Sequence, residues 1–430
     1  MANFLRDLSS VGVSKILMII FGLGTSIVVA RTLGPEKNGV IAALLVYPSL
    51  FMSIGSLGVR QSTTYFLGKG IFSEDRIKTA ITQIWAISSI LSIVVSYYLM
   101  TYFSKSGGNI LWVILALIPI PFSLFNTYNS GIFLGKNQIG VFNKINWIPT
   151  LIIFVLTVVL VYLLAMGVAG YLIAMVAGPI FIFLILLFKN NFIQAFSIQF
   201  DFEVIKKMLG LGMVYATALL VINLNYRIDV ILLDNLSVDY EIGIYSKGSG
   251  IIQYLWQIPM LLSTIVFARS ATSKDDKAYS YKVAQLLRIS IFFIGLGSVI
   301  LVTFSRWIII TMYGDDFVGS ISVLQWLLPG VLLLTIFKVM NVDLAGKGKP
   351  WISMKAMVPA LIVNIALNLF LIPEFGADGA AIGSTISYSL AAILFLHFYS
   401  KETSITVKEI FNFKKQDYQF VENLISKVKK

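Results

Sequence analysis

Cysteine is absent from this chain of 430 residues, and histidine occurs once, at His397. Without thiols the chain cannot form disulfides, thiolate zinc sites or a cysteine nucleophile. A single histidine also disfavours a histidine-based metal site or proton relay. Charged residues are scarce, at 13% of the chain, whereas soluble domains carry about 25%. There is therefore too little charge to cover the surface of a soluble protein.

Motifs for catalysis or nucleotide binding are missing as well. No Walker A sequence is present, so the chain is not expected to consume ATP. The adjacent acids Asp315 and Asp316 are typical of a solvated turn rather than a metal site. The chain is instead 57% hydrophobic, with a mean hydropathy of +0.86, which excludes a disordered chain. We expect no enzyme, no resident metal and no cofactor.

Long apolar segments dominate the sequence and predict an all-α membrane protein. A helix of about 20 apolar residues crosses a bilayer, and its backbone groups are then paired within the helix. The first segment is too long, and too charged at Arg31, to be a cleaved signal peptide. Twelve transmembrane helices are predicted, at 16–34, 39–59, 79–103, 110–134, 145–166, 168–188, 208–233, 242–267, 283–304, 321–342, 352–373 and 377–399.

Basic residues are distributed asymmetrically between the predicted loops. With a cytoplasmic N-terminus, 27 of the 33 lysines and arginines fall on the inner side and five on the outer side. This positive-inside pattern predicts an inner-membrane protein with both termini in the cytoplasm, and accounts for the net charge of +12 without nucleic acid as a partner. In the tail, 401–430, the spacing of Val421, Leu424, Ile425 and Val428 favours a basic amphipathic helix on the inner leaflet; a solvated, frayed tail is the alternative.

Short sequences recur at an interval of about 210 residues. Leu134-Gly135-Lys136 matches Ala345-Gly346-Lys347, and Gly167-Val168-Ala169-Gly170 matches Gly376-Ala377-Asp378-Gly379. Since each half holds an even number of spans, the halves have the same orientation and are related by a pseudo-twofold axis along the membrane normal. The sequence thus predicts two six-helix bundles, 1–200 and 201–400, which enclose a cavity and rock against each other in alternating access.

The strongest candidate site lies in the segment Asn223-Leu224-Asn225-Tyr226-Arg227-Ile228-Asp229, within the span 208–233. An ionised side chain inside a membrane is costly, about 2.5–3.5 kcal/mol on insertion scales. Arg227 and Asp229 are about 200° apart around a helix, so Asn223 shares a face with Arg227 and Asn225 shares one with Asp229. At least one face should meet protein or water. Each charge is either a substrate contact in the cavity or a clamp between helices.

Other polar residues extend the candidate substrate-binding set. Asn126 and Asn129 share a face of the span 110–134, and Asn364 and Asn368 are spaced i, i+4 in the span 352–373; such amides also join helices. Arg31 and Arg60 end the first and second spans, and are cavity cations or interfacial anchors. Lys338 and Asp343 are too far apart in sequence for direct pairing along a helix, and interfacial snorkelling is expected for Lys338.

The ordered set of motifs resembles Wzx-type polysaccharide flippases of the multidrug/oligosaccharidyl-lipid/polysaccharide exporter superfamily. The resemblance rests on Arg31-Thr32-Leu33-Gly34-Pro35, on the segment from Asn225 to Asp229, on Gly243-Ile244-Tyr245-Ser246, and on Ala345-Gly346-Lys347-Gly348-Lys349-Pro350. The run from Asn364 to Pro373 completes it. The lipid II flippases of this superfamily are expected to have fourteen spans, so twelve spans disfavour that branch.

This resemblance implies that an undecaprenyl-diphosphate-linked oligosaccharide, such as an O-antigen unit, is flipped from the inner to the outer leaflet. Membrane lipids and other polysaccharide assembly proteins are the expected partners. Proton or sodium coupling stays open. One alternative is a drug or small-cation antiporter of the same fold, which would be expected to carry acidic cavity groups. Another is a membrane glycan polymerase or glycosyltransferase, which would need a sizeable outer catalytic loop.

Overall fold

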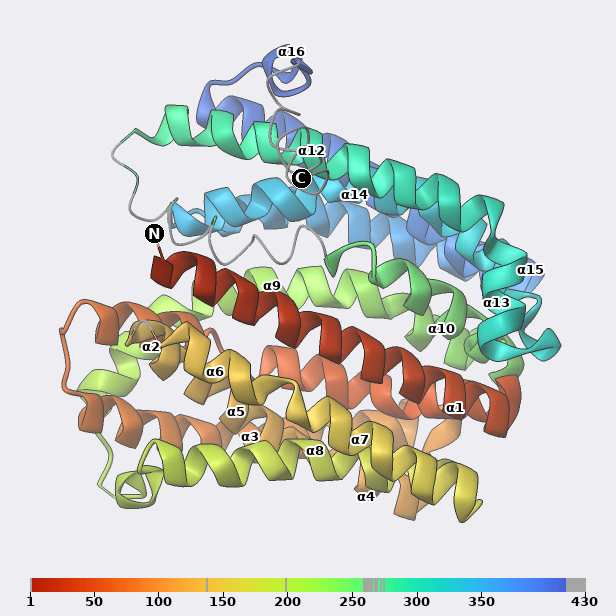
Figure 1. Ribbon diagram of the computed structural model, residues 1–430, viewed down its shortest axis with the longest axis horizontal. Coiled ribbons are helices and arrows are strands. Elements are labelled where there is room, and N and C mark those ends of the chain that lie inside the picture. The colour runs from red at the N-terminus through yellow and green to blue at the C-terminus, as the bar shows by residue number, and fades with distance from the viewer. Residues whose placement is uncertain are drawn as a thin grey trace. The chain divides into compact units, whose positions relative to one another are not determined.

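The computed structural model describes residues 2–136, 138–197, 199–257, 266, 270, 273 and 275–414, with the side chains of residues 2–11 and 139 left out. Regular structure in these ranges is helical throughout (Figure 1). The main helices are α1 Ala2–Ile54, α2 Val59–Gly68, α3 Glu74–Phe103, α4 Ile110–Leu117, α5 Pro119–Gly135, α6 Ile139–Asn146, α7 Ile148–Thr157, α8 Gly167–Lys189, α9 Phe202–Leu236, α10 Asp239–Gln253, α12 Asp276–Thr303, α13 Ser305–Tyr313, α14 Ser320–Gly346, α15 Trp351–Thr403 and α16 Val407–Ile410.

Nine helical segments within the described ranges are long and apolar enough to cross a membrane. Two of them are interrupted, because α1 contains Gly34 with φ 73° and α15 contains Gly376 with φ 52°. These breaks fall between the predicted spans 16–34 and 39–59, and between 352–373 and 377–399. The predicted span 242–267 runs past Gln257, where the described residues stop. The chain is thus an all-helical, multi-pass membrane protein, and the count of twelve spans stays a prediction.

The local backbone agrees between the two copies of the predicted repeat. Lys136, which caps α5, has φ −83° and ψ 1°, and Lys347, which caps α14, has φ −76° and ψ 7°. Gly167 and Gly376 both have a positive φ, of 62° and 52°. Since L-residues rarely adopt a positive φ, this second match is a specific one. The structure therefore supports the repeat at these positions, while the two-bundle arrangement stays a prediction.

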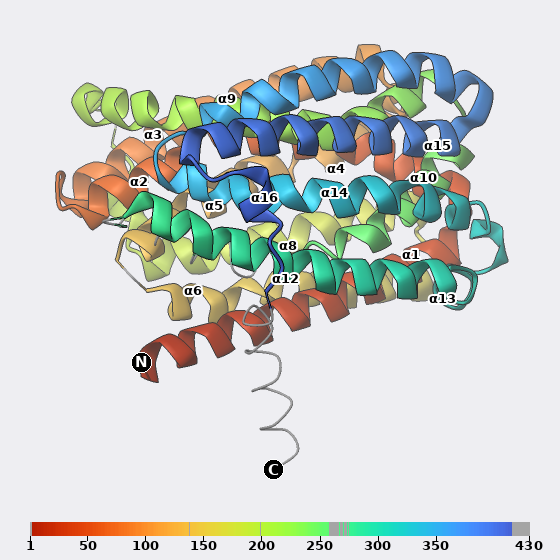
Figure 2. The same cartoon turned by 90° about the horizontal axis from the view of Figure 1, so that it is seen from above.

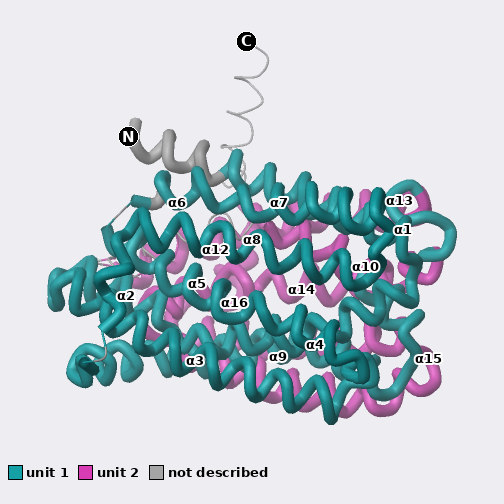
Figure 3. Tube along the Cα trace, turned by 90° about the horizontal axis from the view of Figure 1, so that it is seen from below, with its two compact units in different colours: residues 1–246, 311–317 teal, residues 247–310, 318–430 magenta. Residues whose placement is uncertain are grey.

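The helices gather into two compact units, shown in different colours in Figure 3. Unit 1 comprises Met1–Ser246 and Thr311–Phe317, and unit 2 comprises Lys247–Ile310 and Val318–Lys430. In unit 2, α12, α14 and α15 run side by side (Figure 2). The units differ from the predicted halves 1–200 and 201–400, because α9 and the start of α10 pack within unit 1. The two units are defined by their internal contacts and not by a structural repeat. The predicted symmetry-related halves 1–200 and 201–400 therefore stay a prediction.

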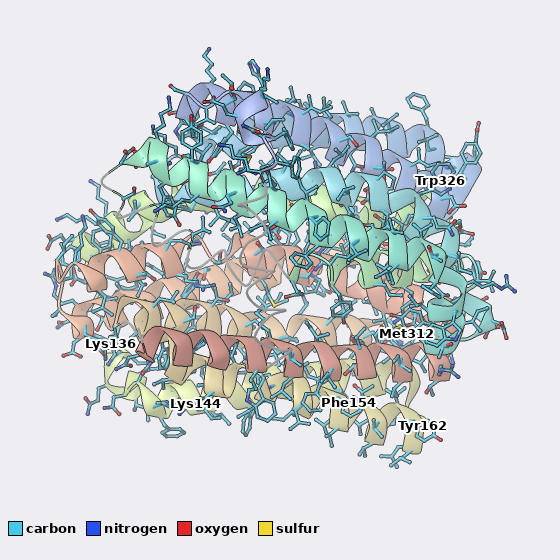
Figure 4. The ribbon with its side chains drawn as sticks, turned by 45° about the horizontal axis from the view of Figure 1, so that its top comes forward. Lys136, Lys144, Phe154, Tyr162, Met312 and Trp326 are labelled. Carbon is cyan, nitrogen blue, oxygen red and sulfur yellow. The ribbon has the colours of Figure 1, made fainter. Side chains whose placement is uncertain are left out.

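Contacts at one end of unit 1 join segments that the sequence places on the outer side. Arg31 donates hydrogen bonds to the carbonyl oxygens of Thr311 and Met312, at 2.6 Å and 3.0 Å; Met312 is labelled in Figure 4. The Lys105 ammonium donates to the carbonyl oxygen of Ser237 at 3.0 Å. Each of these contacts links one predicted outer segment to another. They agree with the predicted grouping of the loops.

Contacts at the other end join predicted inner segments. Lys136 forms an ion pair with Glu74, and Arg76 forms one with Asp201 at 2.7 Å. The hydrogen bonds from Arg76 hold the pKa of the Asp201 carboxyl below its usual value. In Figure 4, Lys136 and Tyr162 lie at opposite ends of the helices of unit 1, as the predicted loops require. Which end faces the cytoplasm stays a prediction, and the predicted tail helix around 421–428 lies outside the described residues.

Candidate functional site

The polar segment of α9 presents two different faces. Asn225 and Asp229, four residues apart, are fully buried. The Asp229 carboxylate accepts a hydrogen bond of 2.6 Å from the Tyr245 hydroxyl on α10. Neither polar atom of the Asn225 amide has a hydrogen-bond partner among the described residues. A buried polar group without a partner costs about 1–3 kcal/mol, so Asn225 marks a place where a water molecule, an ion or a ligand group would be stabilised.

The opposite face of α9 carries Arg227, whose side chain is exposed. The structure therefore separates Arg227 from Asp229, as the 200° between them requires, and meets the expectation that at least one of the two faces is covered by protein. Asn223 lies nearby but donates its amide to the carbonyl oxygen of Leu219 on its own helix, at 2.7 Å. A contact of Arg227 or Asn223 with substrate stays a prediction.

A pair of cations lies near the predicted inner end of unit 1. Lys15 on α1 and Arg60 on α2 are both half-buried, and Arg60 is close enough to repel the Lys15 ammonium electrostatically. Among the described residues, neither charged group has an acidic or hydrogen-bonding partner. By contrast, Lys78 lies 2.8 Å from the Glu74 carboxylate at the same end. Two half-buried like charges without a counterion are unfavourable unless an anion binds.

Sequence reasoning selected Arg60 but not Lys15. Lys15 stands one residue before the first predicted span, where the sequence pattern indicates only a contribution to the basic excess of the inner side. Arg60 lies 45 positions further along the chain, so their proximity is a tertiary feature. The detectable signal was an isolated basic residue at each of two neighbouring inner span ends, with no acid within four positions of either.

Arg31 serves the end of a helix. Its guanidinium donates to the carbonyl oxygens of the last turn of α13, at Thr311 and Met312. These carbonyl groups have no partner within their own helix, and the negative end of the helix dipole favours a cation there. This contact corresponds to the anchoring alternative for Arg31, and a role in substrate binding stays a prediction.

The paired asparagines join helices. In unit 1, Asn126 on α5 donates to the carbonyl oxygen of Pro179 on α8 at 3.2 Å, and Asn129 accepts a hydrogen bond from Asn190. In unit 2, Asn368 donates to Asn364 at 2.6 Å within the part of α15 before the break at Gly376, and Asn364 donates to Ser384 beyond that break at 3.5 Å. These contacts match the structural alternative for amides in membranes. Contact of any of the four with substrate stays a prediction.

Two charged groups of unit 2, Asp343 and Lys338, were not singled out as sites by sequence. Asp343 is fully buried and accepts hydrogen bonds from Ser280 at 2.8 Å and Tyr399 at 2.7 Å, and Lys347 completes an ion pair with it at 3.1 Å. Lys338 does not pair with Asp343 but lies 3.9 Å above the Trp256 ring. Within the described ranges, no group of three or more His, Asp or Glu side chains is placed to hold a metal ion.

Several known proteins are similar to this chain over most of its length. A Shigella flexneri protein that carries the name O-antigen transporter is 23% identical over 394 residues, which cover 87% of this chain and 93% of that protein. The lipid II flippase MurJ in an inward closed conformation superposes with a TM-score of 0.75 at 16% identity, covering 96% of this chain and 95% of that one. An inward-facing multidrug resistance transporter of the MATE family gives 0.74 at 14% identity, covering 90% and 94%.

At these identities the two structural neighbours show the fold only. The fold that they share with this chain agrees with the resemblance noted from the sequence. The model of the family described as polysaccharide biosynthesis protein matches residues 28–322, about two thirds of the chain. The matched region contains Arg31, Arg60 and the polar segment of α9. The chain belongs to the polysaccharide biosynthesis protein family.

Proposed function

We propose that this protein is a flippase that moves a lipid-linked oligosaccharide, with undecaprenyl diphosphate as carrier, from the cytoplasmic to the outer leaflet. Family membership and the similarity to the Shigella O-antigen transporter support this function. The fold shared with MurJ and MATE transporters is compatible with it. An O-antigen unit or another surface polysaccharide unit is the expected cargo. The proposed function is transport alone, without an enzymatic reaction.

The cations Lys15 and Arg60, which have no acidic partner among the described residues, are the observation that carries the proposal. A diphosphate has several negative charges, and phosphate forms strong, charge-assisted hydrogen bonds with guanidinium and ammonium groups. Two half-buried cations that repel each other would be relieved by such a ligand. Their position near the inner ends of the first two predicted spans suits capture of the lipid head group from the cytoplasmic leaflet.

Transport requires that the polar head group never enters the hydrocarbon. Polar groups without hydrogen-bond partners are strongly unfavourable there, so the glycan would cross through a polar cavity while the isoprenoid chain stays in the lipid. Alternating access by rocking of the two predicted halves is the expected mechanism. Proton or sodium coupling is a further prediction, with Asp229 as the candidate coupling acid.

The nearest competing function is an antiporter for drugs or small cations, because MATE transporters share the fold. Such a substrate would favour accessible carboxylates. The one acid of the α9 segment, Asp229, is instead buried and hydrogen-bonded to Tyr245. At the predicted inner end, the half-buried cations Lys15 and Arg60 have no acidic partner among the described residues. These observations favour an anionic substrate.

Reconstitution into liposomes tests the proposal directly. Wild-type protein should move a fluorescent polyprenyl-diphosphate oligosaccharide between leaflets, and Arg60→Ala and Lys15→Ala should each slow flipping while Arg60→Lys keeps part of it. Lys282→Ala, which removes an exposed lysine of the predicted inner side, is the control. Wild-type protein that moves cationic dyes but not this lipid would refute the flippase and favour the antiporter.

A further inference from the structure

Unit 1 contains an apolar groove that has no role in the diphosphate binding proposed above. It has a volume of 290 Å³ and is lined by α1, α3 and the start of α9, with Phe51, Leu57, Leu91, Phe202 and Leu209 among its residues. Ligand pockets begin at roughly 300 Å³. The groove therefore has room for a short stretch of a long, flexible ligand rather than for the whole of one.

The lining of the groove suits a hydrocarbon chain. Small side chains of α3, Ser88 and Ser92, lie at positions where bulky residues would fill the space, and the large lining residues are apolar. Part of its rim is open: Leu91 is 62% exposed and Phe202 73% exposed. Leu91 belongs to the predicted span 79–103, and Phe202 begins α9, a helix long and apolar enough to cross a membrane, so a chain could enter the groove sideways from the lipid.

The groove lies close along the chain to Arg60, one of the two cations. Leu57 lines it, and Arg60 follows three residues later, so their Cα atoms are at most about 11 Å apart. The backbones of Gly58 and Gly212 touch at this point, which holds the start of α2 against α9. A diphosphate bound by Lys15 and Arg60 would thus lie within reach of a hydrocarbon chain in the groove.

One wall of the groove is held in place by ion pairs. Arg76 at the start of α3 contacts the carboxylates of Asp201 and Glu203 at 2.7 Å and 2.9 Å. These acids flank Phe202, which lines the groove. The Arg76 contacts therefore fix the start of α9 beside α3 and keep the groove formed at the predicted inner end.

We propose that this groove binds the part of the polyprenyl chain next to the diphosphate, while Lys15 and Arg60 hold the diphosphate itself. This inference rests on the proposed flippase function and adds to it a place for the carrier lipid. Phospholipid acyl chains are also hydrocarbon, but their head groups carry a single phosphate. Two neighbouring cations, Lys15 and Arg60, therefore favour the diphosphate carrier over membrane phospholipids.

Site-specific crosslinking in liposomes tests the groove with two neighbouring positions of α3. Leu91 lines the groove, whereas Ile90 is similarly exposed, at 65%, but does not line it. With p-benzoylphenylalanine at each position of the full chain, we expect a labelled polyprenyl-diphosphate oligosaccharide to crosslink at position 91 and not at 90. Unlabelled polyprenyl diphosphate should compete, and phosphatidylglycerol should not. Equal crosslinking at both positions, or equal competition by phosphatidylglycerol, would overturn the proposal.

A substitution that fills the groove tests the same proposal by measuring transport. Leu91→Trp should raise the KM for the lipid-linked oligosaccharide by about tenfold, equivalent to about 1.4 kcal/mol, while Ile90→Trp should leave it unchanged. If wild-type protein flips the lipid and Leu91→Trp flips it with an unchanged KM, the groove proposal is wrong but the flippase function stands. If wild-type protein does not flip the lipid, the proposed function itself fails.

Discussion

The backbone of Gly39 on α1 lies directly against the carbonyl group of Asp239 on α10. The contact is reciprocal, because the backbone of Gly243 lies against the carbonyl group of Pro35. No side chain separates the two helices at this crossing. In the predicted topology it joins the second and eighth spans at their outer ends, where alternating access would require the two halves to separate.

This crossing predicts a large effect from one methyl group. A Cβ atom at Gly39 would overlap the Asp239 carbonyl group, so Gly39→Ala should lower the free energy of unfolding by about 1–3 kcal/mol, the usual range for overpacking. The control is Gly250→Ala on α10, where nothing lies within 4 Å of the added atom; helix propensity should make that change neutral or stabilising. Thermal unfolding in detergent compares the two, and equal midpoints would contradict the crossing.

The sequence predicted well those features that depend on neighbouring residues. Hydropathy located the long helices, and the predicted spans end at or next to the breaks at Gly34 and Gly376, because hydropathy is a local signal. The partners of buried charges were not predictable. Asp343 receives hydrogen bonds from Ser280 and Tyr399, both more than 50 positions away, and no periodicity encodes such distances.

The face of α9 that carries Arg227 was inferred from helical spacing alone. Its exposure is what a substrate contact requires, so Arg227→Ala should largely abolish flipping in liposomes at unchanged membrane levels. Arg227→Lys should retain part of it, since a point charge still attracts phosphate but lacks the planar fork. Flipping by Arg227→Ala at the wild-type rate would exclude a substrate contact, and loss of the variant from the membrane would indicate a structural clamp.

The predicted orientation can be tested on this cysteine-free chain. Lys69 and Asp315 are both exposed and belong to predicted inner and outer loops. In intact cells an impermeant maleimide should label Lys69→Cys only after permeabilisation and Asp315→Cys without it. The reverse pattern would invert the topology, and labelling of both positions in intact cells would show that the two loops share the outer side.

The buried Asp343 carboxylate should be among the most sensitive positions of unit 2. Its oxygens accept from Ser270, Ser280 and Tyr399 and pair with Lys347. Asp343→Ala leaves the Lys347 ammonium, itself only 6% exposed, without its counterion. Removing one partner of a buried pair costs about 3–5 kcal/mol, a loss that denaturant titration of the purified protein would measure.

The exposed carboxylate of Asp276 provides the matched control, because Lys347 contacts only its backbone carbonyl oxygen. Asp276→Ala should therefore change stability little. The double variant Asp343→Asn with Lys347→Met should recover part of the loss seen in Asp343→Asn alone, since the unpaired ammonium rather than the missing pair is the main cost. If the double variant is less stable than Asp343→Asn, the hydrogen bonds from Lys347 to Ser280 and to the Asp276 carbonyl oxygen stabilise the protein by more than the buried charge costs. That outcome would show that the ion pair between Asp343 and Lys347 is not the main stabilising contact at this site.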